Sequence, residues 1–168
     1  MTSADGPILV LGIGNVLLGD DGIGVHVVGA LERLAERGTV VLPPDVRLVD
    51  GGTIGLALLP LVSGARAVVL VDAVDIGRAP GAVEVLDGEA LGGVTPRVKA
   101  PLPVGVADIV AAARLTEPAP EVIVLVGVQP GAIAPGIELS GPVRAAVPAA
   151  VEAVLDAIRR LSAVEVVA

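Results

Sequence analysis

Residues 7–31 have the sequence PILVLGIGNVLLGDDGIGVHVVGAL, and this stretch decides the fold class. Residues 7–13 form an apolar run of the length expected for a buried strand. Residues 23–37 place apolar side chains on one helical face and charged side chains on the other, and Gly38 then ends the pattern. A buried strand followed by an amphipathic helix is typical of α/β proteins.

The remaining chain continues this alternation of short apolar runs and longer amphipathic runs. Strands are expected at 46–50, 65–73, 82–87 and 121–128, and helices at 55–62, 104–115 and 142–161. The alternating pattern of 82–87 indicates a half-exposed strand or a strand at the edge of the sheet. Pro148 should kink the last helix or mark its true start. The length predicts a single domain over residues 1–168.

The composition excludes several classes of protein. Without cysteine, the chain has no disulfide, no thiolate metal site and no cysteine nucleophile. The net charge of −8, with Lys99 as the one lysine and no aromatic residue, argues against a nucleic-acid partner. Mean hydropathy is high at +0.86, but no apolar run approaches the ~18 residues of a spanning helix. The first residues, MTSADG, lack the basic region of a signal peptide, so we expect a soluble cytoplasmic protein.

Polar residues follow four of the predicted strands. Because the carboxyl ends of parallel strands meet at one edge of the sheet, these side chains should lie on a common rim. They are Asn15, Asp20, Asp21, Asp50, Asp72 and Gln129. Several converging acids indicate a hard-cation site or an acid–base site. The alternative is that aspartates simply favour turns and helix starts, and either Asp20 or Asp21 is expected to cap the first helix.

Two other kinds of site have weaker support. Gly12-Ile13-Gly14 follows a strand as in dinucleotide-binding loops, but Leu17 takes the place of the third glycine. The single histidine, His26, is expected on the solvated side of the first helix. The serines do not fall on the acidic rim, and Ser140 is expected to cap the last helix. A catalytic triad is therefore not predicted.

Four segments of the chain form one specific combination. They are GIGNVLLGDDGIGVHVVGAL (12–31), DGGTIGLALLPLV (50–62), VVLVDAV (68–74) and LVGVQPGAIAPGIELSGPVRAAV (125–147). In this order and spacing they resemble the [NiFe]-hydrogenase maturation endopeptidases. The resemblance covers roughly residues 8–160. It implies an α/β three-layer sandwich in which a twisted, mostly parallel five-stranded sheet has helices on both faces. It also implies an endopeptidase that removes the C-terminal extension of a [NiFe]-hydrogenase large-subunit precursor after nickel insertion.

The resemblance assigns roles to particular residues. Asp21 and Asp72 would coordinate the nickel that the precursor carries, and they would also be the catalytic residues. The third ligand of the family is a histidine, and its position falls on Leu102, which cannot bind a metal. Asn15, Asp50 and the glycines at 51 and 52 would shape the cleft.

The leucine leaves three hypotheses open. The enzyme works with two carboxylates because the precursor already holds its nickel, or it recruits Asp50, Gln129 or a backbone carbonyl as a further ligand. Alternatively, the protein is a non-catalytic reader or chaperone of the nickel site. A small-molecule or nucleotide binder on the same sheet is the rival from another class.

Overall fold

The computed structural model describes residues 6–87, 90–91 and 105–163. These residues form a five-stranded sheet of order β2-β1-β3-β5-β4. The strands are β1 Ile8–Ile13, β2 Val46–Gly52, β3 Ala67–Ala73, β4 Val83–Asp87 and β5 Val122–Val128. Strands β2, β1, β3 and β5 run parallel, whereas β4 pairs antiparallel with β5 at the edge. The predicted mostly parallel sheet and the predicted edge strand are both confirmed.

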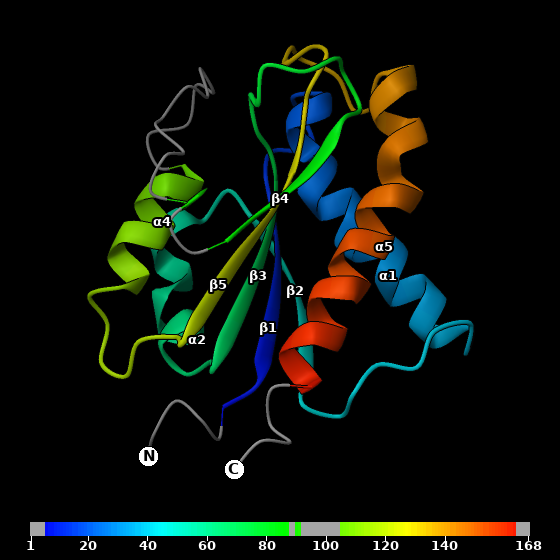
Figure 1. Cartoon of the computed structure of the whole chain (residues 1–168). Coiled ribbons are helices and arrows are strands. Elements are labelled where there is room, and N and C mark those ends of the chain that lie inside the picture. Colours follow the sequence, from blue (N-terminus) through cyan, green and yellow to red (C-terminus); the bar gives the residue numbers. More distant parts are fainter. Residues whose placement is uncertain (1–5, 88–89, 92–104, 164–168) are drawn as a thin grey trace.

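Helices cover both faces of the sheet, as Figure 1 shows, so the predicted three-layer sandwich is confirmed. One face carries α1 (Ile23–Glu36) and α5 (Gly141–Ala163), and the other carries α2 (Leu59–Ser63) and α4 (Val106–Ala113). Short 3₁₀ turns, Asp20–Gly22 and Gly55–Leu58, precede α1 and α2. Among the described residues, no helix is both long enough and apolar enough to span a membrane.

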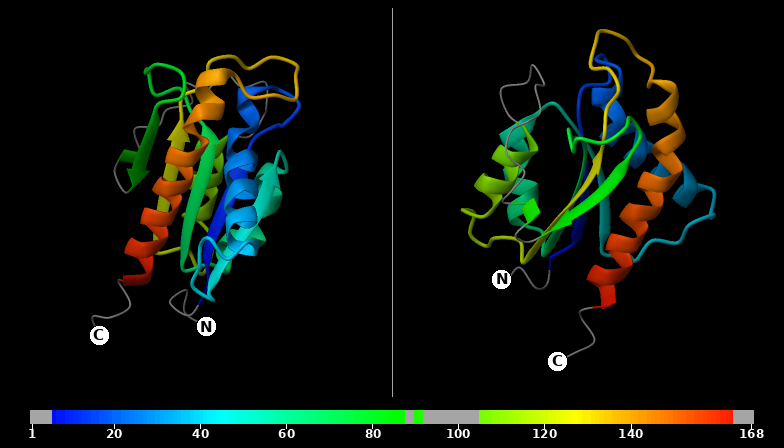
Figure 2. Two further views of the ribbon diagram at one scale, coloured as in Figure 1. Left: turned by 90° about the vertical axis from the view of Figure 1, so that its right-hand side faces the viewer. Right: turned by 45° about the horizontal axis from the view of Figure 1, so that its top comes forward.

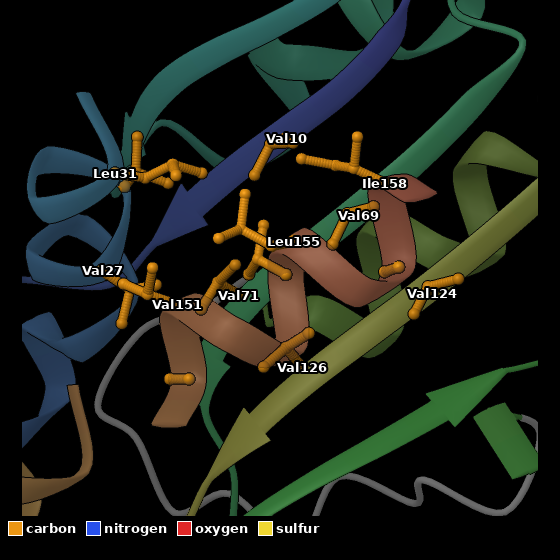
Figure 3. Packing of buried hydrophobic residues seen from close by; sticks show 14 of the residues in the cluster. Val10, Val27, Leu31, Val69, Val71, Val124, Val126, Val151, Leu155 and Ile158 are labelled. Atoms are coloured by element: carbon orange, nitrogen blue, oxygen red, sulfur yellow. The ribbon is translucent and has the colours of Figure 1, made fainter. Parts of the chain in front are cut away.

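Each face of the sheet buries its own apolar layer, because successive strand residues point to opposite sides. Figure 3 shows the layer under α1 and α5, where Val69, Val71 and Val126 of the sheet pack against Val27 and Leu155. The opposite layer joins Leu11, Leu70 and Leu125 to Leu58 and Ile109. Strands covered on both faces need apolar residues at every position, which explains the unbroken runs in the sequence.

Two expectations about the chain differ from the structure or lie outside it. α5 begins at Gly141 and continues through Pro148, so this proline does not mark the start of the helix. Its ring lies on the exposed side of α5, where a missing backbone hydrogen bond can be replaced by water. Leu102, the residue at the family's histidine position, lies outside the described residues.

The carboxyl ends of the four parallel strands lie at one end of the sheet, uppermost in Figure 1. The segments that leave β1, β3 and β5 gather there, and Figure 2 brings this end forward in its right-hand view. The fold therefore places the residues after these strands on one rim.

Candidate active site: two buried carboxylates at the rim

The turn after β1 is sharp because Gly14 has a φ of 129°. A Cβ at this position would lie 1.8 Å from the carbonyl oxygen of Asp21, so only glycine fits. The following Asn15 side chain accepts a hydrogen bond from the N–H of Leu17 at 2.9 Å and fixes the next turn. The chain thus folds back on β1 and enters the 3₁₀ turn that carries Asp20 and Asp21.

Asp21 is 2% exposed and is held by its own loop. Its Oδ2 accepts a hydrogen bond from the N–H of Asn15 at 2.8 Å. Within the described residues, Oδ1 accepts none. One oxygen of Asp21 is therefore fixed, and the other remains available for a substrate, a water molecule or a cation.

Asp72 lies near the carboxyl end of β3 and is 8% exposed. Its Oδ1 accepts a hydrogen bond from the N–H of Ala73 at 2.8 Å. Burial first, and the negative charge of Asp21 second, raise the pKa of Asp72 well above its usual range. The structure thus brings Asp21 and Asp72 close enough for their charges to interact, as the rim prediction required. A carboxyl group with a raised pKa beside a second carboxyl group is a pattern of acid–base sites.

Asp20 is bonded to a different segment from this pair and is 1% exposed. It accepts hydrogen bonds from the N–H groups of Gly131, Ala132 and Ser140 and from the Ser140 hydroxyl. Burial alone would raise the pKa of Asp20, but these hydrogen bonds outweigh it and lower the pKa. Asp20 is therefore an anchor for the segment after β5.

These contacts correct two predictions. Neither Asp20 nor Asp21 caps α1, because the N-cap is Gly22 and has no side-chain capping bond. Ser140 does lie at the acidic rim, since its hydroxyl donates to Asp20 at 2.7 Å. The sequence carried no signal for this contact, because the two residues are 120 positions apart.

The other predicted rim residues fasten the loops. The Oε1 atom of Gln129 accepts hydrogen bonds from the N–H groups of Ile76 and Arg78. Exposed Asp50 accepts the N–H of Gly52 at 2.9 Å. Gln129 and Asp50 thus each have a structural use, in agreement with the turn interpretation.

His26 lies on the same side of α1 as the exposed Arg33 and Arg37, but it is less solvated than predicted. It is half-buried, and its Nε2 is buried without a hydrogen-bond partner. Burial first, and then the positive charges of Arg33 and Arg144, lower the pKa of His26. Because Arg144 belongs to α5, part of this charge effect comes from a second helix, whose position the periodicity of α1 could not show.

The glycines that suggested a nucleotide loop serve packing. A Cβ at Gly12 would lie 2.4 Å from the carbonyl oxygen of Gly24, so the pair lets α1 approach β1 closely. The start of α1 is occupied by the buried Asp20 and Asp21, whose charge would repel a phosphate.

The described residues contain no group of three or more His, Asp or Glu side chains that could hold a metal ion. Asp21 and Asp72 offer oxygen ligands from two positions only. This donor set fits a cation whose remaining ligands come from another molecule.

Comparisons with known proteins give the relatives of this chain. Residues 25–157 match a family described as hydrogenase maturation protease. The hydrogenase 2 maturation protease of Escherichia coli K12 is 39% identical over 153 residues, which cover 90% of each chain. The hydrogenase expression/formation protein HupD of Rhodobacter capsulatus is 40% identical over 93% of this chain and 71% of that protein.

Solved structures agree with the sequence matches. The hydrogenase maturating endopeptidase HybD from E. coli has a TM-score of 0.80 at 38% identity, over 92% of this chain and 93% of that one. The [NiFe] hydrogenase maturation protease HybD from Thermococcus kodakarensis has a TM-score of 0.68 at 25% identity, over 90% and 99%. The chain belongs to the hydrogenase maturation protease family.

Proposed function

We propose that this protein is an endopeptidase that removes the C-terminal extension of a [NiFe]-hydrogenase large-subunit precursor. The observation that carries the proposal is the meeting of Asp21 and Asp72 at the rim of a chain whose E. coli relative matches it over 90% of both lengths. The cytoplasmic location and the lack of a nucleic-acid partner remain predictions from the sequence.

Nickel enters the proposal as part of the substrate. Asp21 and Asp72 each use one oxygen for a backbone hydrogen bond, which orients the carboxyl group and leaves its second oxygen for the cation. The precursor's own ligands would supply the rest of the coordination sphere. This division of ligands is the first hypothesis that Leu102 left open, and the fastening role of Gln129 supports it over recruitment of that side chain.

The two carboxyl groups can divide the chemistry of peptide hydrolysis between them. Asp21 and Asp72 would polarise the scissile carbonyl or the attacking water, helped by the positive charge of the substrate's nickel. The surroundings of Asp72 suit this, because burial and the Asp21 charge raise the pKa of its carboxyl group.

The test is intact mass spectrometry of a nickel-loaded precursor incubated with the protein. We expect the wild-type protein to remove a C-terminal peptide and Asp21→Asn to leave the precursor mass unchanged. Asp156→Asn, an exposed substitution on α5, is the matched control and should cut normally. A stable complex with an unchanged precursor mass would instead make the protein a reader of the nickel site.

A further inference from the structure

Asp20 takes no part in the proposed chemistry, yet it is fastened more firmly than either reactive carboxylate. Its Oδ2 accepts from Gly131 at 2.8 Å, from Ala132 at 3.0 Å and from the Ser140 hydroxyl at 2.7 Å, and its Oδ1 accepts the Ser140 N–H at 2.7 Å. Hydrogen bonds to an ionised acceptor are about twice as strong as neutral ones. All four donors belong to the segment 131–140.

Backbone hydrogen bonds run beside this contact. Gly19 donates to the carbonyl of Gly136 at 2.9 Å, and Gly136 donates to the carbonyl of Leu17 at 2.9 Å. Asp20 donates its own N–H to Ala132 at 3.3 Å. The segment 131–140 thus pairs with the loop 15–22 through a short set of backbone bridges, and Asp20 directly follows the bridged residues Leu18 and Gly19.

Apolar packing adds little to this pairing. Of the residues in 131–140, only Leu139 is a buried hydrophobic residue, and most of the others are exposed. Hydrogen bonds therefore hold the two segments together, and four of them are made to the Asp20 carboxylate.

The geometry assigns Asp20 the role of a positioning residue that fixes the carboxylate of Asp21. Asp21 follows Asp20 directly, and its Oδ2 is held by Asn15 at the other end of the same loop. With the loop anchored at Asn15 and at Asp20, the direction of the Asp21 side chain is set before substrate arrives. This inference rests on the proposed function, because it concerns how the proposed catalytic group is aimed.

The substitution Asp20→Asn keeps the size of the side chain and removes its charge. In either orientation of the amide, its NH₂ group would face at least one N–H donor of the segment 131–140. Ser140→Ala removes the hydroxyl donor alone and keeps the carboxylate and the backbone donors. Asp156→Asn is again the exposed control.

We expect Asp20→Asn to lower kcat/KM for trimming of the nickel-loaded precursor by about 10–100-fold, with the larger part of the loss in kcat, because the attack geometry is lost while Asp72 still faces the substrate. Ser140→Ala should show the same split with a smaller loss of kcat. Hydrogen exchange gives a second readout. The amides of Asn15, Gly131 and Ala132 should exchange faster in Asp20→Asn, and those of β3 and β5 should not.

A folded Asp20→Asn or Ser140→Ala variant with the wild-type kcat would overturn the inference, and so would a loss confined to KM. If Asp20→Asn does not fold, Ser140→Ala decides the question alone. Failure of the proposed function is seen separately, as a wild-type protein that does not trim the precursor at all.

Discussion

Gly24 allows α1 to lie against the sheet, and replacing it by alanine gives the sharpest test of this packing. A Cβ at Gly24 would lie 2.1 Å from the carbonyl oxygen of Val71 and 2.4 Å from that of Ile13. Ordinary contact begins near 3.4 Å, so α1 must retreat by more than 1 Å. The atoms it meets are backbone atoms of β1 and β3 and cannot turn aside.

Gly24→Ala is expected to lower the free energy of unfolding, although helix propensity alone would predict an increase. Alanine in place of glycine within a helix gains about 0.5–1 kcal/mol. Overpacking of a core typically costs about 1–3 kcal/mol, and a rigid backbone neighbour places Gly24→Ala at the upper end. We expect a net loss of about 2 kcal/mol, or a fall in Tm of about 4–8 °C for a chain of this size.

The matched control lies in the same helix. A Cβ at Gly29 would meet only the Nη1 atom of Arg33, at 3.4 Å, which is the end of a flexible side chain. Gly29→Ala should therefore gain about 0.5–1 kcal/mol. Urea unfolding followed by far-UV circular dichroism measures both, since the chain has no aromatic residue for fluorescence. Equal shifts in the two variants would refute the close packing of α1 on the sheet.

Three further predictions concern ionisable groups. Burial and the Asp21 charge raise the pKa of Asp72, so the native state binds this proton more tightly than the unfolded chain, and the resulting stability is lost as the pH rises above 3.8 through the raised pKa. Asp72→Asn should therefore be more stable than wild type at pH 8, and this difference in stability should become smaller toward pH 4. A difference in urea midpoint that does not change with pH would contradict this. Burial and two arginine charges lower the pKa of His26, so its contribution to stability is present above pH 6.5 and lost as the pH falls through the lowered pKa. His26→Gln should lose less stability than wild type between pH 7 and pH 5 in thermal unfolding, and parallel curves would count against the buried imidazole. Asp45 pairs with the buried Arg66 at 2.6 Å while itself 39% exposed, so Asp45→Ala should cost about 1 kcal/mol in urea unfolding, and no measurable loss would show that solvent screens the pair.

The fold followed from the sequence because its central strands are buried on both faces. The run at 121–128 became β5 at Val122–Val128, and the run at 7–13 became β1 at Ile8–Ile13. The closeness of Asp21 and Asp72 could also be predicted, since Asp21 follows β1 and Asp72 lies at the end of β3, and the carboxyl ends of these parallel strands share one edge. The local sequence pattern was sufficient to place a residue where its neighbours belong to its own helix or strand. It was also sufficient where they lie at the shared carboxyl edge of the parallel strands.

The residues that the sequence misplaced are those whose surroundings come from distant segments. His26 lies on the polar stripe of α1, but its Nε2 is buried, and Arg144 of α5 lies near enough for its charge to act on the ring. Ser140 precedes α5 as a cap would, yet its hydroxyl donates to Asp20. A helical pattern describes one helix and contains no information about which neighbour covers its polar side.

Asp20 and Asp21 show how hydrogen bonding divides two tasks between adjacent identical residues. Four donors occupy the two oxygens of Asp20, so this carboxylate has little capacity left for a further ligand. Among the residues that the structure describes, one backbone donor contacts Asp21, so this carboxyl group is oriented and its Oδ1 accepts no hydrogen bond. A fully bonded carboxylate can hold a loop, whereas a carboxylate with one oxygen in reserve can bind or react. Among the described residues Asp72 also has one backbone donor, so by this criterion it groups with Asp21 as a carboxyl group that can bind or react.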